Sequence, residues 1–166
     1  MTRRGARAAA DRPATRPRAA SSARLALSLQ IEDGADRALL APARVRRWLQ
    51  AALERPAEIT LRVVDEAEAL ALNRTWRGQD HATNVLTFDY AREPVVQADL
   101  VLCAPVVRRE ARDAGKSLEA HYAHLVVHGA LHAQGWDHLE DAQAEAMENR
   151  ERAVLEALGY PDPYGD

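Results

Sequence analysis

The segment from His128 to His138 constrains the fold of this chain more than any other. It reads H-x-x-x-H-x-x-G-x-x-H, and Gly135 follows the second histidine, His132, by three residues. Histidines four residues apart lie one turn apart on the same face of a helix. A glycine can end that helix in a left-handed conformation and reverse the chain. The pattern therefore predicts a helix, a tight turn and three imidazoles that meet in space.

Three imidazoles with a fourth position left open are the ligand set of a catalytic zinc site. We therefore predict that His128, His132 and His138 bind one divalent metal ion per chain, zinc by default and nickel or another divalent metal as alternatives. The spacing is that of the metzincin proteases, but Gly129 stands where their catalytic glutamate would be. A zincin-like peptidase is therefore the weaker interpretation.

Two more histidines, His121 and His124, continue the same helical stripe. His124 and His132 are two turns apart, about 12 Å along the axis, and cannot share a metal ion whose bonds to imidazole are about 2 Å long. The helical pair is either His124 with His128 or His128 with His132, and the glycine turn favours the second. His121 and His124 are then expected to be surface residues or structural groups near the site.

Length and charge set broader limits. The 166 residues suffice for one domain with a full core. Residues 1–24 contain seven arginines and one acidic residue, a net charge of +6, and we predict a disordered basic extension there. The other 142 residues carry 15 basic and 24 acidic groups, a net charge of −9, so charge alone does not indicate a nucleic-acid-binding protein.

The location of the protein is predicted from its cysteine and its apolar runs. The single cysteine, Cys103, cannot form an internal disulfide and fits a reducing compartment, the cytoplasm. No apolar run approaches the roughly 20 residues that span a bilayer, so we expect no membrane association. The oligomeric state is left open.

Hydrophobic periodicity predicts nine elements after residue 24. They form a single α+β domain over residues 25–166, with a four-stranded mixed sheet and about five helices. The histidine helix is apolar on most sides, so we expect it to be central and buried. Strands are predicted at 25–31, 59–63, 83–88 and 98–103, and helices at 42–55, 65–78, 105–115, 117–135 and 141–158.

The histidine segment resembles the H-G-x-L-H-x-x-G-Y-D-H motif of the YbeY family of bacterial metal-dependent endoribonucleases, with Trp136 in place of the usual tyrosine. Residues 72–80 are similar to the family's L-N-x-x-[YW]-R-x-x-D segment. Two strands also resemble family motifs, with Thr87 in place of serine and Ala98 in place of glycine. The C-terminal residues fit as well, so the likeness spans about residues 70–164.

This resemblance implies a single-strand-specific endoribonuclease that matures the 3′ end of small-subunit ribosomal RNA and acts in ribosome quality control. Ribosomal RNA precursor and the small ribosomal subunit are the implied partners. The resemblance also implies the three histidine ligands and assigns the family's conserved arginine to Arg77. An arginine beside a metal can bind the negative charge that develops on phosphate oxygens during cleavage. Both water and the RNA 2′-hydroxyl are open as the nucleophile.

Two further assignments are weaker. Asp137 is expected either to orient a histidine ligand or manage a proton, or to cap the turn after the helix. Asn84 and Thr83 are expected to contact substrate. The alternative function is a noncatalytic ribosome-assembly factor with a structural metal, which a fourth protein ligand would favour.

Overall fold

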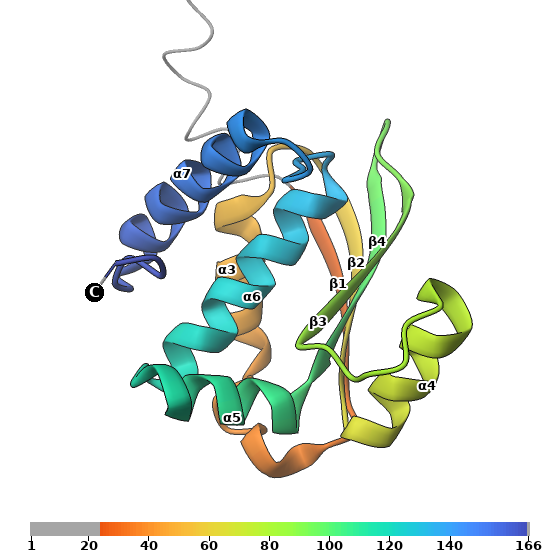
Figure 1. The fold of residues 1–166 in the computed structure, drawn as a ribbon. Coiled ribbons are helices and arrows are strands. Elements are labelled where there is room, and N and C mark those ends of the chain that lie inside the picture. Colours follow the sequence, from red (N-terminus) through yellow and green to blue (C-terminus); the bar gives the residue numbers. More distant parts are fainter. Residues whose placement is uncertain (1–23, 166) are drawn as a thin grey trace, which may run out of the picture.

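A four-stranded mixed sheet forms the centre of this protein in a computed structural model that describes residues 24–165 (Figure 1). The strand order is β1-β2-β4-β3. Neighbours β1, β2 and β4 are parallel, and β3 runs antiparallel to β4. The predicted four-stranded mixed sheet is therefore confirmed. The strands are β1 (Leu25–Ile31), β2 (Ala57–Val64), β3 (Val85–Ala91) and β4 (Val96–Cys103).

Five α-helices accompany the sheet, as predicted, and local signals set several of their ends. The side chain of Ser117 accepts a hydrogen bond from the backbone N–H of Ala120 and so caps one N-terminus. Gly78 and Gly115 end two helices with φ angles of 67° and 66°. The helices are α3 (Pro42–Ala52), α4 (Glu66–Arg77), α5 (Ala104–Ala114), α6 (Leu118–Ala133) and α7 (Asp141–Leu158).

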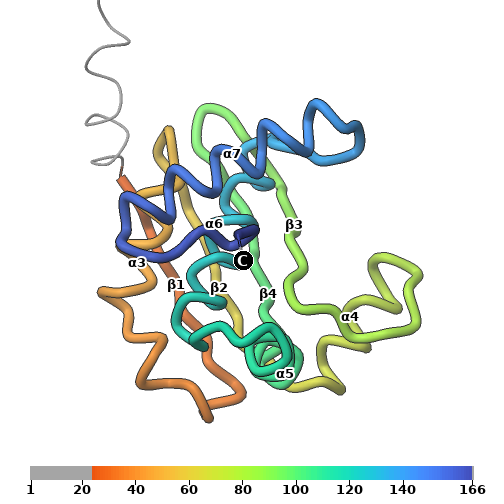
Figure 2. The backbone as a smooth tube through the Cα atoms, turned by 60° about the vertical axis from the view of Figure 1, so that its left-hand side comes forward, coloured from red at the N-terminus to blue at the C-terminus, as the bar shows by residue number. Residues whose placement is uncertain are grey.

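The helices cover the sheet unequally. Figure 1 shows α3 and α6 on one face and α4 on the other. Successive side chains of β4 pack on opposite faces of the sheet. Leu100 packs in the core shared with α3 and α6, whereas Val101 packs in a smaller cluster with Ala69 of α4. In Figure 2, α7 lies over the outer side of α6 and α3, and the C-terminal residues turn back beside α6. Helix α6 is therefore central and buried, as predicted.

Several boundaries differ from the prediction. Strands β2 and β4 each begin two residues earlier, and β3 begins two residues later, at Val85, and runs to Ala91. Pairing explains the first difference, since the extra residues of β2 and β4 lie opposite each other in the register. A short 3₁₀ helix, η2 (Gly34–Asp36), was not predicted. It contributes Asp36, which accepts hydrogen bonds from Tyr122 and Arg108.

Two further predictions concern the N-terminal residues and membrane-spanning helices. The predicted basic extension lies outside the described residues, except Arg24, whose carbonyl accepts a hydrogen bond from the N–H of Ala57. Within residues 24–165, no helix is both long and apolar enough to cross a membrane.

Candidate active site

Helix α6 brings two of the predicted ligands together. The ring centroids of His128 and His132, on successive turns, are 5.5 Å apart, and that of His138 lies 5.7 Å and 5.1 Å from them. One nitrogen from each ring can be chosen so that all three lie within 4.8 Å of one another. These three histidines, and no carboxylate or thiolate of the described residues, form the group that can hold a metal ion.

The turn after α6 returns His138 to the other two histidines. The N–H of Gly135 donates to the carbonyl of His132, and the N–H of Trp136 donates to that of Leu131, at 3.0 Å and 3.1 Å. This pair of bonds is the Schellman arrangement, and Gly135 adopts the positive φ of 106° that the reversal requires. The backbone N–H of His138 then donates to Asp137 Oδ1 at 2.7 Å. The predicted helix–glycine–histidine geometry is present.

A buried carboxylate holds the first histidine. Glu151 of α7 is fully buried, and its Oε2 lies 2.6 Å from His128 Nδ1. Desolvation alone would raise the pKa of Glu151, but hydrogen bonds from His124, His128 and Tyr164 outweigh it and lower that pKa to about 2. With Nδ1 occupied by the carboxylate, Nε2 of His128 is the nitrogen left to bind a metal.

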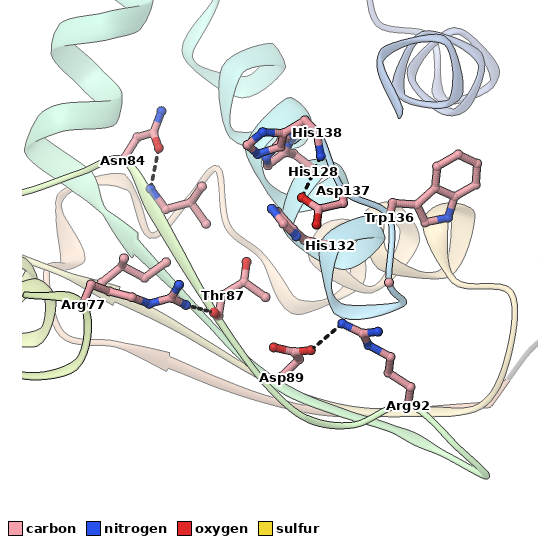
Figure 3. Close-up of a pocket in the computed structure, with 13 residues that line it drawn as sticks. Arg77, Asn84, Thr87, Asp89, Arg92, His128, His132, Trp136, Asp137 and His138 are labelled. Atoms are coloured by element: carbon pink, nitrogen blue, oxygen red, sulfur yellow. Dashed lines mark hydrogen bonds and ion pairs between the residues drawn. The ribbon is translucent and has the colours of Figure 1, made fainter. Parts of the chain in front are cut away.

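The histidines share a cleft of about 330 Å³ with residues from β3 and α4 (Figure 3). Arg77, the last residue of α4, lines this cleft and donates a hydrogen bond to the carbonyl of Thr87. Its guanidinium carbon lies 5.2 Å from the centroid of the Phe88 ring. The structure therefore places Arg77 at the same cleft as the three histidines. Asp89 and Arg92 also line it and are joined by a 3.0 Å hydrogen bond.

Burial favours the neutral form of His132. Desolvation, followed by the proximity of His128 and His138, lowers its pKa below the ordinary value. Neutral imidazole is the form that binds a metal ion, so burial keeps His132 in the form that can act as a ligand.

Gly129 is glycine because α6 crosses the sheet closely at this point. A Cβ at position 129 would lie 3.1 Å from Leu100 Cδ2 and 3.4 Å from Thr87 Oγ1. Leu100 is fully buried and has little room to move. Any side chain at this position, including the glutamate of the metzincin proteases, would crowd Leu100 and Thr87 of the sheet.

Known proteins resemble this chain over most of its length. The family model described as "Endoribonuclease YbeY" matches residues 30–159. The chain belongs to the YbeY endoribonuclease family. It is 66% identical over 140 residues to the "Endoribonuclease YbeY" of Methylibium petroleiphilum, covering 84% of this chain and 94% of that protein. It is 58% identical over 147 residues to that of Paracidovorax citrulli, covering 86% and 97%.

The fold of this YbeY-family member also has a solved counterpart. The solution structure of TM1509 from Thermotoga maritima matches it with a TM-score of 0.52 at 25% sequence identity. The match covers 86% of this chain and 99% of the other. The family resemblance read from the sequence motifs is thus confirmed.

The sequence did not reveal the carboxylates behind the histidines of this YbeY-family chain. His121 and His124 are not surface residues, because both are largely buried and lie 2.9 Å from Glu110 and Glu151. The surface interpretation was wrong, and the structural one fits. Glu110 and Glu151 lie on α5 and α7, and no spacing in the sequence relates them to the histidines.

Of the three residues with weaker assignments, Asn84 and Asp137 line the cleft and Thr83 does not. Asn84 lines the cleft, and its side-chain amide donates to Glu110, which also contacts His121. Thr83 is not among the residues that line the cleft. Asp137 lines the cleft, and its Oδ1 accepts a hydrogen bond from the N–H of His138.

Proposed function

We propose that this protein is a metal-dependent endoribonuclease that cleaves single-stranded RNA and matures the 3′ end of small-subunit ribosomal RNA. A role in ribosome quality control goes with that activity, as does a cytoplasmic location with the small ribosomal subunit as partner. The observation that carries the proposal is that three converging histidines and Arg77 line one cleft of a YbeY-family fold.

The donor set fits a divalent metal ion. Three imidazole nitrogens are borderline ligands that suit zinc, and nickel or another transition metal less specifically. His128, His132 and His138 would hold the ion at the cleft. Held there, zinc would supply Lewis-acid chemistry and a hydroxide source at near-neutral pH.

Arg77 is proposed to bind the phosphate under attack. Its hydrogen bond to the Thr87 carbonyl and its contact with the Phe88 ring hold the guanidinium at the cleft. The remaining N–H groups can bind nonbridging phosphate oxygens in a forked geometry as negative charge develops there. In this role Arg77 stabilises the transition state more than the ground state.

Two other cleft residues assist. Asp137, with one oxygen on the N–H of His138, keeps a second oxygen to orient a histidine or accept a proton. Arg92 adds positive charge on the β3 side of the cleft. The cleft thus offers two arginines to an RNA phosphate, although Asp89, which pairs with Arg92, and Asp137 line it as well.

The test is the cleavage of a labelled single-stranded RNA by zinc-loaded protein, compared with Arg77→Ala. We expect turnover to fall about 100- to 1,000-fold, the usual loss when one oxyanion donor is removed, with bound zinc unchanged. Arg74→Ala is the matched control, because Arg74 lies on the same helix, pairs with Asp80 and does not line the cleft.

Two results of this experiment would argue against the proposed function or mechanism. Unchanged turnover in Arg77→Ala would remove this arginine from the mechanism. A wild-type protein that binds zinc but cleaves neither free RNA nor RNA in the small subunit would favour the noncatalytic assembly factor.

A further inference from the structure

We propose that Glu151 and Tyr164 are positioning residues for the metal ligand His128, so that the C-terminal residues 162–165 support the active site. Neither residue lines the cleft or belongs to the three-histidine group. The proposal rests on the proposed function only in assuming that this group binds a metal ion.

Glu151 accepts hydrogen bonds from three side chains. Its Oε2 lies 2.6 Å from His128 Nδ1, and its Oε1 lies 2.9 Å from His124 Nε2 and 2.5 Å from the hydroxyl of Tyr164. The carboxylate is fully buried. A buried carboxylate is tolerated only when donors satisfy it, so these contacts are mutually dependent.

The contact with Glu151 selects one tautomer of His128. A carboxylate accepts and does not donate, so the hydrogen of neutral His128 lies on Nδ1 and the lone pair lies on Nε2. The same contact fixes the rotation of the ring, whose side chain is 23% exposed at the edge of the cleft. A carboxylate behind a histidine ligand thereby orients the ring and increases its basicity toward the metal.

Tyr164 extends this arrangement to the C-terminal residues. Their path is fixed at two further points, since the N–H of Tyr164 donates to Asp162 and Lys116 Nζ donates to the carbonyl of Pro163. Figure 2 shows these residues returning beside α6. The ring of Tyr164 also packs at 5.3 Å from that of His124, between centroids. The C-terminal residues therefore pack against His124 and Glu151, the side chains behind the metal ligand His128.

Two substitutions test the arrangement, each with a matched control. Glu151→Gln keeps the shape but leaves one acceptor oxygen, so it cannot accept from both sides. Tyr164→Phe removes one of three donors. Glu156→Gln is the control on an exposed face of α7, and Tyr160→Phe is the control for the tyrosine, because Tyr160 contacts Glu119 and Trp48 instead of Glu151.

The first readout is zinc affinity, measured by competition with a chromophoric chelator. We expect Glu151→Gln to bind zinc about 10- to 100-fold more weakly, the usual effect of removing a carboxylate behind a histidine ligand. Tyr164→Phe should lose less, roughly three- to tenfold, because two donors to Glu151 are kept. Both controls should bind like the wild type.

The second readout is nitrogen NMR of ¹⁵N-histidine-labelled, metal-free protein. The wild type should show His128 protonated on Nδ1, and the population of this tautomer should fall in Glu151→Gln. Folded Glu151→Gln with wild-type affinity and tautomer would overturn the proposal, as would equal losses in Tyr164→Phe and Tyr160→Phe. If Glu151→Gln does not fold, the two tyrosine variants decide. A wild-type protein that binds no metal would instead contradict the proposed function.

Discussion

At the scale of single residues, Gly135 determines whether the third histidine meets the other two. Its φ of 106° is a conformation that residues with a side chain adopt only at a cost, and an added Cβ would lie 3.3 Å from Arg92 Nη1. The position of His138 therefore depends on the backbone of a residue that offers no ligand.

Replacing Gly135 with alanine should weaken both the fold and the site. We expect Gly135→Ala to lower the free energy of unfolding by about 1–3 kcal/mol and zinc affinity by at least about tenfold, because His138 is displaced. Gly115→Ala is the control, since Gly115 has a φ of 66° with no atom within 4 Å of its added Cβ. Urea unfolding and zinc titration should show a stability loss in both variants but an affinity loss only in Gly135→Ala.

Gly129 matters for a different reason, the close approach of α6 to the sheet. Alanine favours a helix over glycine by about 1 kcal/mol, but overpacking costs about 1–3 kcal/mol, and Leu100 is fully buried. We expect Gly129→Ala to be destabilising by up to about 2 kcal/mol. In a double-mutant cycle with Leu100→Ala, the cost of the added methyl should disappear. Strict additivity would show that the two positions do not compete for space.

At the scale of elements, the buried His121 on α6 makes stability depend on pH. His121 is 7% exposed, and its Nδ1 has no hydrogen-bond partner. Burial lowers its pKa, against the opposing effect of Glu110, while His124 and Lys116 lower it further. The folded protein therefore resists protonation of His121, whereas the unfolded chain accepts a proton at its ordinary pKa.

This difference in the pKa of His121 between the folded and unfolded states sets the direction in which stability changes with pH. Below the ordinary histidine pKa of about 6.5 the unfolded state binds more protons, so stability falls as pH drops from about 7.5 to 5. Unfolding of the metal-free protein in urea at several pH values should show this decrease. His121→Gln should show a smaller decrease over the same range, because it removes one of the contributing groups. An equal decrease in both proteins would contradict the role given to His121.

The ends of the helices were easier to predict from the sequence than the ends of the strands. Local signals placed the helix ends well, since Ser117, Gly78 and Gly115 act through their own backbone neighbourhood. Strand ends were less accurate because they depend on partners elsewhere in the chain, as the paired extensions of β2 and β4 show. Asp65 with a glutamate three residues later, Glu68, is the pattern of a capping box, but only half of that box forms. The Asp65 side chain caps the helix, but that of Glu68 contacts Arg62.

The same limit applies to the site. The three histidines were predictable because one helix, one turn and fixed spacing bring them together. Glu151 was not, because its contact with His128 depends on how α7 packs on α6. The contact of His124 with Glu151 was not predictable for the same reason.

At the scale of the whole molecule, the protein combines an acidic overall charge with a cleft that offers arginines and a cation site. The formal net charge is −3. Arg77 and Arg92 nonetheless line the cleft beside three histidines. We propose that RNA cleavage requires a metal ion in this cleft and that the three histidines bind it.

The most direct measurement is bound zinc per chain together with single-stranded RNA cleavage, in the wild type, His132→Ala and His121→Gln. His121 is the control because it lies on the same stripe of α6 but outside the three-histidine group. We predict one zinc per chain in the wild type and in His121→Gln. We predict loss of both bound zinc and cleavage in His132→Ala. A full equivalent of zinc in His132→Ala would contradict the assignment of the metal ligands. Undiminished cleavage by metal-free protein would contradict the metal dependence of the reaction.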